Sequence, residues 1–227
     1  MNTAGGAFVG GLSMADLKTS PQTANTDGEI TLGLLNAVHE NTSLTQRSIA
    51  QELGIALGLT NAYLKRCVKK GFIKVRQIPR NRYAYYLTPT GFAEKSRLSA
   101  EYLSQSFRFF RIARAECSDL FALCAEHGWR RVMLVGVGDL GEIATLCARE
   151  HPVTLVGFVD GDSDVSAFAG LRVTGDMEAL GQADAAVITD LANPQQTFEA
   201  ARRVLPPERV LAPPFLKVSR HGPGRRG

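Results

Sequence analysis

The sequence predicts an α/β protein of two units, in which a small helical unit ending in a β-hairpin is joined by a long helix to a parallel sheet. Charge divides the chain, because residues 60–91 contain eight basic and no acidic side chains, whereas residues 160–190 contain seven acidic side chains and one basic. Residues 92–127 contain neither proline nor glycine. Beyond residue 130, short apolar runs alternate with helical patterns, as in a sheet covered by helices.

The composition sets the limits of this prediction. With 227 residues, 44% of them hydrophobic, the chain can bury two ordinary cores. No window approaches the roughly 18 uninterrupted apolar residues of a membrane span, and the start lacks a secretory signal, so we expect a cytoplasmic protein without membrane contact. Residues 1–27 and 217–227 are rich in small, polar or basic residues and are predicted to be a disordered N-terminus and a flexible basic tail.

The four cysteines form no CxxC pair and lie near no histidine cluster. We therefore expect free thiols that fill the cores, and no metal site. Redox sensing by Cys117 and Cys124 stays open as an alternative, because seven residues separate them and place both on one helix face. The other two cysteines are Cys67 and Cys147.

Three helices are expected at the start of the first unit. Apolar residues recur at helical spacing in residues 29–40, and a second helix is predicted over residues 45–53, with Thr45 as its N-cap. The segment GIALG, residues 54–58, has glycine at both ends and predicts a turn. A third helix then follows from residue 59 and is closed by Gly71, which gives a helix-turn-helix order.

Two strand-like runs come directly after the third helix. Residues 72–77 and 82–88 are joined by the tip IPRN, so a basic hairpin is expected. A hairpin in this position makes the arrangement a winged helix-turn-helix over residues 28–91.

The third helix and the hairpin carry the side chains expected to bind double-stranded DNA. Asn and Arg can pair with adenine and guanine edges, while the other cations suit phosphates or an adjacent minor groove. A merely solvated charged face is the alternative, which the complete lack of acidic residues disfavours. The candidate DNA-binding residues are Thr60, Asn61, Tyr63, Lys65, Arg66, Lys69, Lys70, Arg80 and Arg82.

These residues also carry a family resemblance. The run SIAQELGIALGLTNAYLKRCVKKGFIKV, followed by NRYAYYLTPTGFAEKSRL, resembles winged-helix regulators of the MarR type, and most closely the subgroup associated with exopolysaccharide biosynthesis genes. The resemblance covers about residues 28–115. It implies a dimeric bacterial transcription regulator that binds an inverted repeat.

Residues 92–127 are expected to form one long helix or two broken ones that connect the units. Positions 103, 107, 110, 114, 117, 121 and 124 alternate in steps of four and three, and all but Arg114 are apolar. Such a stripe is often core, but a helix projecting from a small domain has little of its own to pack against. We therefore expect this helix to make a homodimer.

The second unit begins with an apolar strand, residues 130–135, that runs into glycines spaced as GxGxxG. A first glycine permits a tight turn, a second lets a pyrophosphate approach the backbone, and a third lets the helix pack on the strand. Asp160 ends the next strand, 19 residues after the last glycine, where it can accept from ribose hydroxyls. The candidate cofactor-binding residues are Gly136, Gly138, Asp139, Leu140, Gly141 and Asp160.

About five strands alternate with helices in the second half, which predicts a small Rossmann-like sheet over residues 128–216. The order VMLVGVGDLGEIA, VGFVDGD, GLRVTGDMEAL resembles the nucleotide-binding domains of polysaccharide-biosynthesis nucleotide-sugar dehydratases and the NAD-binding half of redox-sensing repressors. The resemblance implies a bound nucleotide. Asp139 departs from it, because a negative charge in the turn should weaken pyrophosphate binding unless it points to solvent.

Together, these patterns predict a transcription regulator, a repressor of surface-polysaccharide genes, that responds to a nucleotide or nucleotide sugar in its sheet unit. Control by NAD(H) is the alternative within the same class, and so is a sheet unit that binds no nucleotide and serves dimerisation or partner contact. No Tyr-x-x-x-Lys pair or other catalytic constellation follows the glycine turn. We therefore expect no enzyme and no catalytic residues.

Overall fold

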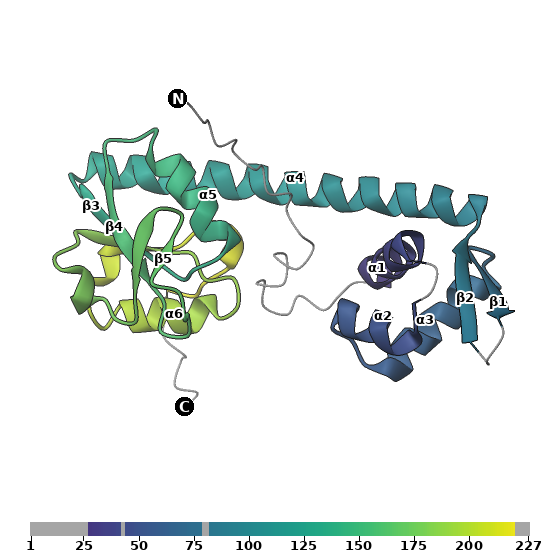
Figure 1. Ribbon diagram of the computed structural model, residues 1–227. Coiled ribbons are helices and arrows are strands. Elements are labelled where there is room, and N and C mark those ends of the chain that lie inside the picture. The colour runs from purple at the N-terminus through teal and green to yellow at the C-terminus, as the bar shows by residue number, and fades with distance from the viewer. Residues whose placement is uncertain (1–26, 42–43, 79–81, 221–227) are drawn as a thin grey trace, which may run out of the picture. The chain divides into compact units, whose positions relative to one another are not determined.

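The computed structural model describes residues 27–41, 44–78 and 82–220 (Figure 1). Among these, the chain forms two compact units, and the boundary between them falls between Phe109 and Phe110. The predicted disordered residues 1–26 lie outside the described residues, whereas Asp27 already belongs to the first helix.

The first unit contains three helices and a hairpin. In chain order the elements are α1 (Asp27–Glu40), α2 (Gln46–Leu53), α3 (Leu57–Lys69), β1 (Ile73–Ile78) and β2 (Arg82–Leu87). The strands pair antiparallel from Ile73 opposite Leu87 to Ile78 opposite Arg82. This is the predicted order of helices and strands.

Local chemistry explains where α2 begins and ends. The Thr45 hydroxyl accepts from the Ser48 backbone N–H at 3.1 Å, and the Ser48 hydroxyl accepts from the Thr45 N–H at 3.0 Å, which completes a capping box. Gly54 ends the helix with a φ of 65°, a left-handed conformation that favours glycine. The structure confirms Thr45 as the N-cap.

The third helix begins two residues earlier than predicted. Its N-cap is Ala56, which makes no side-chain hydrogen bond, so no capping residue marks the start in the sequence. Gly58 therefore lies inside α3 rather than in the turn, and the turn is only three residues long.

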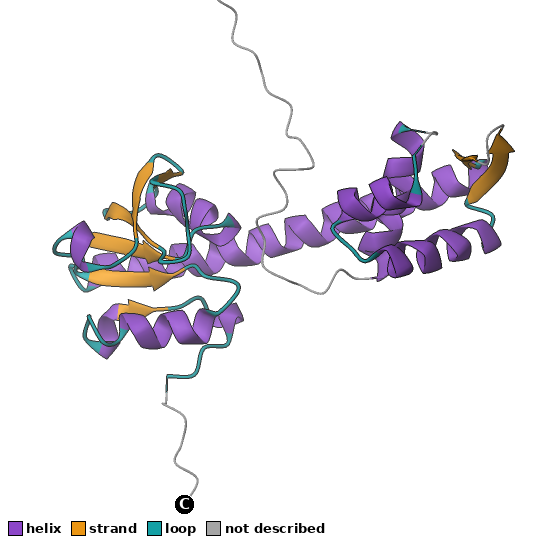
Figure 2. Cartoon of the chain, turned by 60° about the horizontal axis from the view of Figure 1, so that its bottom comes forward, coloured by secondary structure: helices purple, strands orange, loops and turns teal. Residues whose placement is uncertain are grey.

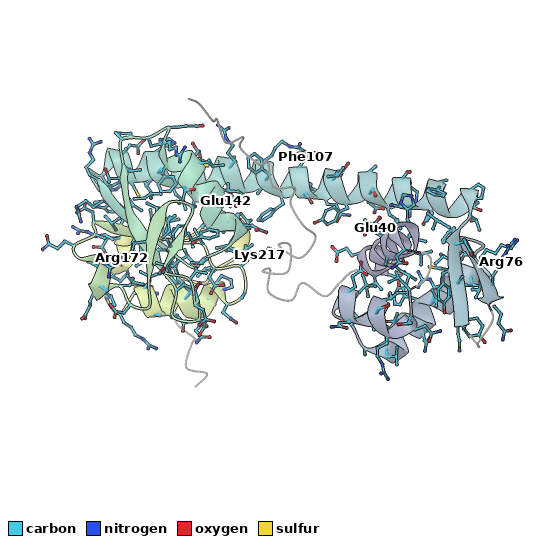
Figure 3. All side chains as sticks on the ribbon, viewed as in Figure 1. Glu40, Arg76, Phe107, Glu142, Arg172 and Lys217 are labelled. Carbon is cyan, nitrogen blue, oxygen red and sulfur yellow. The ribbon has the colours of Figure 1, made fainter. Side chains whose placement is uncertain are left out.

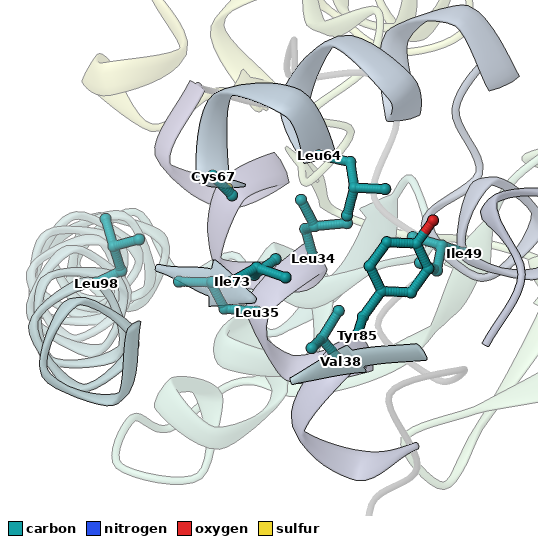
Figure 4. Packing of buried hydrophobic residues seen from close by; sticks show 9 residues of the cluster. All are labelled: Leu34, Leu35, Val38, Ile49, Leu64, Cys67, Ile73, Tyr85 and Leu98. Atoms are coloured by element: carbon teal, nitrogen blue, oxygen red, sulfur yellow. The ribbon is translucent and has the colours of Figure 1, made fainter. Parts of the chain in front are cut away.

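One apolar cluster holds the first unit together (Figure 4). Leu64 and Cys67 of α3 pack onto Leu34 and Leu35 of α1, and all four side chains are buried. The remaining members come from α1, α2, the hairpin and the next helix, and they are Val38, Ile49, Ile73, Tyr85 and Leu98. Burying a Leu side chain contributes about 1.5–3 kcal/mol, so this cluster fixes the face that α3 turns inward.

Of the predicted alternatives, one long helix or two broken ones, the structure has the single helix, α4 (Pro89–Glu126). Its apolar stripe divides into two parts. Leu103 and Phe107 are 52% and 59% exposed, whereas Cys117, Phe121 and Cys124 are fully buried. The helix is thus shared between the units, because Leu98 packs in the first core.

The second unit is a six-stranded sheet with helices. Its strands are β3 (Arg131–Val135), β4 (Thr154–Val159), β5 (Ala167–Phe168), β6 (Leu171–Thr174), β7 (Ala185–Ile188) and β8 (Val210–Leu211). Helices α5 (Asp139–Ala148) and α6 (Pro194–Ala201) pack on it, α5 against β3 and β4 and α6 against β7. Figure 2 shows the strands of this unit in orange between the helices.

The strand order is β5-β6-β4-β3-β7-β8, and all neighbours except β5 and β6 are parallel. In chain order the five parallel strands run 3-2-1-4-5, an order known from doubly wound sheets. The predicted parallel sheet with helices is confirmed. The additional strand β5 pairs with β6 through a two-residue turn. Ala169 and Gly170 both have positive φ, 48° and 78°, as a type I′ hairpin requires.

The start of the predicted flexible tail is held in place. The Ser219 N–H donates to Oε1 of Gln195 at 2.8 Å, and a guanidinium N–H of Arg202 donates to the Arg220 carbonyl at 2.9 Å. These bonds connect Ser219 and Arg220 to α6 and to its C-cap residue. Residues 221–227 lie outside the described residues.

The junction of hairpin and α4 gives a testable prediction. A Cβ atom on Gly91 would overlap the carbonyl oxygen of Phe72, whereas a Cβ on Gly58 would meet nothing within 4 Å. Gly91→Ala should therefore cost about 3 kcal/mol, and Gly58→Ala, inside a helix, should stabilise by about 0.5–1 kcal/mol. Urea unfolding of both variants measures the difference, and equal midpoints would contradict this packing.

Candidate functional site

One side of α3 combines polar and basic side chains next to the hairpin. Asn61, Lys65 and Lys69 recur every four residues, so they follow one another along the helix. Both lysines are exposed and Asn61 is half-buried. With Val75 and Tyr83 of the hairpin they line a shallow hollow of about 340 Å³.

Among the residues that the structure describes, the lining of this hollow has two ammonium groups and no carboxylate. At its α2 end, the side-chain amide of Gln46 donates to the Tyr85 hydroxyl at 3.3 Å. A surface of this kind can bind phosphate oxygens through lysine and a base edge through asparagine. The residues that line it are Gln46, Asn61, Leu64, Lys65, Val68, Lys69, Val75, Tyr83 and Tyr85.

Tyr63 and Arg66 lie on another side of α3 and bind α1. The Arg66 guanidinium contacts both carboxylate oxygens of Asp27, with Nη1 2.8 Å from Oδ1. The Tyr63 hydroxyl donates to the same Oδ1 at 2.5 Å. The carboxylate thus occupies the guanidinium fork that a guanine contact would need.

Lys70 follows at helical spacing, and its Nζ lies 5.7 Å from the Phe72 ring centre.

The Asp27 contacts also set its protonation. Hydrogen bonds from Arg66, and next from Tyr63, lower the pKa of the Asp27 carboxyl from 3.8 to about 2. The carboxylate therefore keeps its charge well below neutral pH, and the link between α1 and α3 persists with it.

The structure corrects the assignment of Thr60. Its side chain is fully buried, and its hydroxyl donates to the Ala56 carbonyl at 3.2 Å. Thr60 shares the inward face with Leu64, which lies one turn further along α3. It therefore packs the helix instead of contacting DNA.

The hairpin candidates are only partly placed. Arg80 lies outside the described residues, and so does the side chain of Arg82, whose backbone belongs to β2. The exposed cations described on the hairpin are Lys74 and Arg76. The Arg76 guanidinium (Figure 3) lies 6.0 Å from the Tyr86 ring centre.

Sequence reasoning missed two exposed residues at the start of α3. Leu57 is 43% exposed and Gly58 is exposed beside it, in the first turn of the helix. The first turn of a recognition helix is the part that contacts base edges. The N-cap Ala56 makes no side-chain hydrogen bond, so the sequence carries no signal for the earlier start of α3, which only the three-dimensional structure shows.

The glycine turn of the second unit follows β3. Gly136 has a φ of 109°, and a Cβ on it would lie 2.5 Å from the Asp190 backbone nitrogen. Gly141 faces the Phe158 ring, where a Cβ would lie 2.6 Å from Cε1. Space over Gly138 is open, so the turn leaves one position where a ligand can approach the backbone.

Asp160 lies beside this turn, as the spacing predicts. Its Oδ2 accepts from the Val137 N–H at 2.8 Å and its Oδ1 from the Asp162 N–H at 3.0 Å. Each oxygen has a second lone pair, so the carboxylate can still accept from a hydroxyl. Asp139 is exposed, whereas the Leu140 side chain is fully buried and can offer a ligand only its backbone.

Two residues that the sequence did not single out complete this edge of the sheet. The Thr189 hydroxyl donates to the Gly136 carbonyl at 2.6 Å. Asp190 accepts from the N–H groups of Ala192 and Asn193 at 2.7 and 3.1 Å, so it shapes the start of α6. Both follow β7, whose carboxyl end lies next to that of β3.

The cysteines behave as core residues. All four are free and buried. Burial raises the pKa of Cys117 to about 12 and that of Cys124 to about 11, so both thiols stay protonated at neutral pH. Redox chemistry proceeds through the thiolate, and this environment disfavours the redox alternative.

Within the described ranges, we find no cluster of three or more His, Cys, Asp or Glu that could hold a metal ion. No helix in the same ranges has the length and hydropathy needed to cross a membrane.

Three helices followed by an antiparallel hairpin, with α3 presenting a basic side next to that hairpin, form a winged helix-turn-helix DNA-binding domain. Residues 28–74 match the family model described as winged helix-turn-helix DNA-binding. No curated protein matches this sequence.

Solved structures with a similar fold include the S. aureus MepR–DNA complex, 21% identical with a TM-score of 0.32. A MepR point mutant bound to an oligodeoxyribonucleotide is 23% identical with a TM-score of 0.31. Each alignment covers 37% of this chain, and 60% and 62% of the respective MepR chains.

The contact between Asp27 and Arg66 predicts a pH dependence. Because the folded pKa lies below 3.8, stability from this contact is complete above about pH 4 and is lost as pH falls toward 2. An NMR titration of the full chain should place the Asp27 midpoint near 2, and Arg66→Leu should move it toward 3.8. Lys65→Leu is the control and should leave it unchanged. An unaltered chain that titrates near 3.8 would contradict the contact.

Proposed function

We propose that the protein is a transcriptional regulator that binds double-stranded DNA with the α3 side that carries Asn61, Lys65 and Lys69. The observation that supports this most is the hollow between that side and the hairpin, whose described lining includes two lysines and no carboxylate. Asn61 lies nearest the start of α3 and can read a base edge, while the lysines further along contact phosphates.

The finer parts of the proposal concern symmetry and target. The MarR-type resemblance supports a homodimer on an inverted repeat, because a two-fold dimer presents two identical recognition helices to two half-sites. Surface-polysaccharide genes as the target, and repression as the sign of control, rest on the resemblance to the exopolysaccharide subgroup alone.

The DNA proposal predicts a selective loss of binding. The double change Lys65→Ala with Lys69→Ala should weaken binding to a duplex at least tenfold and reduce the dependence of log K on log salt by about 2. The matched control is Arg97→Ala, an exposed cation on α4 that is paired with Glu94 and Glu101. Fluorescence anisotropy at several salt concentrations measures both. Equal affinities of the double variant and the unaltered chain would rule out this side of α3.

For the second unit, we propose a sensor that holds a nucleotide-type ligand, a nucleotide sugar or NAD(H), at Gly136, Gly138, Gly141 and Asp160. The open backbone over Gly138 and the position of Asp160 next to the turn support this. The turn offers its N–H groups to a pyrophosphate at the start of α5. For the ligand to act on DNA binding, it must bind two arrangements of the protein with different affinity. In this proposal the unit regulates DNA binding and has no catalytic role.

One observation favours a sheet unit that holds no nucleotide. Both Asp160 oxygens already accept backbone N–H groups of this chain, and Gly136 is closed in by Asp190. In that case the unit serves dimerisation or partner contact.

Calorimetry separates the two proposals for the sheet unit. We expect heat from at least one of UDP-glucose, NAD⁺ and NADH with the full chain, and a loss of that heat in Asp160→Ala. Asp139→Ala should raise affinity by about two- to fivefold, because it removes a charge near the helix start. The control is Asp176→Ala, an exposed acid that follows β6. No heat from any of the three at millimolar concentration would favour the unit that holds no nucleotide.

A further inference from the structure

Among the described residues, one side of α4 is left uncovered. Phe92, Leu103, Phe107 and Phe110 are 45%, 52%, 59% and 39% exposed. Figure 3 shows Phe107 projecting from the helix. At 100° per residue these four positions fall within about 60° of one another around the helix axis. Large apolar side chains gathered along one line are a mark of an interaction surface.

The same line continues with small residues between Phe92 and Leu103. Ser96, Ser99 and Ala100 share this side of the helix, and Ser96 and Ala100 are exposed. The side chains of the stripe are therefore large on the C-terminal side of Leu103 and small in the turns just before it. Phe107 and Phe110 lie four and seven residues after Leu103, and Ser99 and Ser96 lie four and seven residues before it.

We propose that a second copy of the chain covers this stripe, with the two α4 helices antiparallel and the two-fold axis at Leu103. This proposal deepens the proposed homodimer by naming its interface. In this register Phe107 of one copy lies opposite Ser99 of the other, and Phe110 lies opposite Ser96. Each ring enters the space that a serine leaves, as close packing of helices requires.

A parallel pair in register lacks this fit. Each residue then meets its own copy, so Phe107 faces Phe107 and Ser99 faces Ser99. The rings hold the helices apart where the serines leave gaps, and contacts across such gaps are lost. The alternation of large and small along the stripe therefore selects the antiparallel pair.

The area is sufficient for a reversible dimer. A large aromatic side chain buries about 150–250 Å², and about half of each of the four large side chains is exposed. Each copy then contributes roughly 400 Å² of apolar side chain, and the small residues and flanks add to it. The total comes close to the roughly 1,000 Å² that specific interfaces need, which corresponds to dimers that dissociate on dilution.

The register also sets the spacing of the two hairpins. The N-termini of α4, where the hairpins attach, lie 14 residues from Leu103 in each copy. At 1.5 Å per residue this separates the two attachment points by about 42 Å along the helix axis. The distance is closer to one turn of B-DNA, about 34 Å, than to two. We therefore expect half-sites one turn apart.

Cysteine cross-linking of the full chain tests the register, because its native cysteines are all buried. Leu103→Cys should form a disulfide dimer with itself under mild oxidation, whereas Phe107→Cys alone should not, since its two copies lie about 12 Å apart along the axis. A mixture of Phe107→Cys and Ser99→Cys should cross-link. Arg108→Cys, exposed on another side of α4, is the control and should form no disulfide cross-link.

Each outcome has one meaning. Self-linking of Phe107→Cys at the level of Leu103→Cys would establish a parallel pair and overturn the proposal, and so would no link at Leu103→Cys in a chain that is dimeric by light scattering. Light scattering that shows a monomer at 100 μM would also overturn it. Duplex binding by Leu103→Glu, which should be monomeric, tests the DNA function separately: weak binding to a single half-site supports that function even if cross-linking fails.

Discussion

The burial of Leu64 and Cys67 on one side of α3 decides what the rest of that helix can do. These side chains pack onto α1 and the hairpin, so the helix has one rotation about its axis in which they are out of water. That rotation turns Thr60 inward, brings Arg66 to Asp27, and leaves Asn61, Lys65 and Lys69 beside the hairpin. The proposed DNA-binding side is thus the part of α3 that remains exposed once the other side is buried in the core.

Much of this could be predicted from the sequence, because periodicity and end signals are local. Thr45 marks its helix by a side-chain cap, and the glycines of the turn after β3 have positions that their neighbours require. The start of α3 carries no such mark, so the helix was placed two residues late. Arg66 contacts Asp27, and because these residues are 39 positions apart no local pattern indicates that contact.

The stripe on α4 shows the same limit at a larger scale. Its spacing is uniform from Leu103 to Cys124, yet the structure covers only the later part. Periodicity identifies the face that a helix can bury and leaves open which partner buries it. That question depends on which other segments pack against the helix. In the described part of the second unit such contacts lie in the later part of α4, where Glu116 accepts from the Phe215 N–H at 2.8 Å.

The glycine turn is hydrogen-bonded on two sides. The Gly136 N–H donates to the Val159 carbonyl at 2.9 Å, while its carbonyl accepts from Thr189, so the strands on both flanks of β3 hold one residue. A backbone fixed in this way has little freedom left to surrender. A ligand that binds beside Gly136 therefore meets backbone that is already ordered, which reduces the protein's own share of the entropic cost of association.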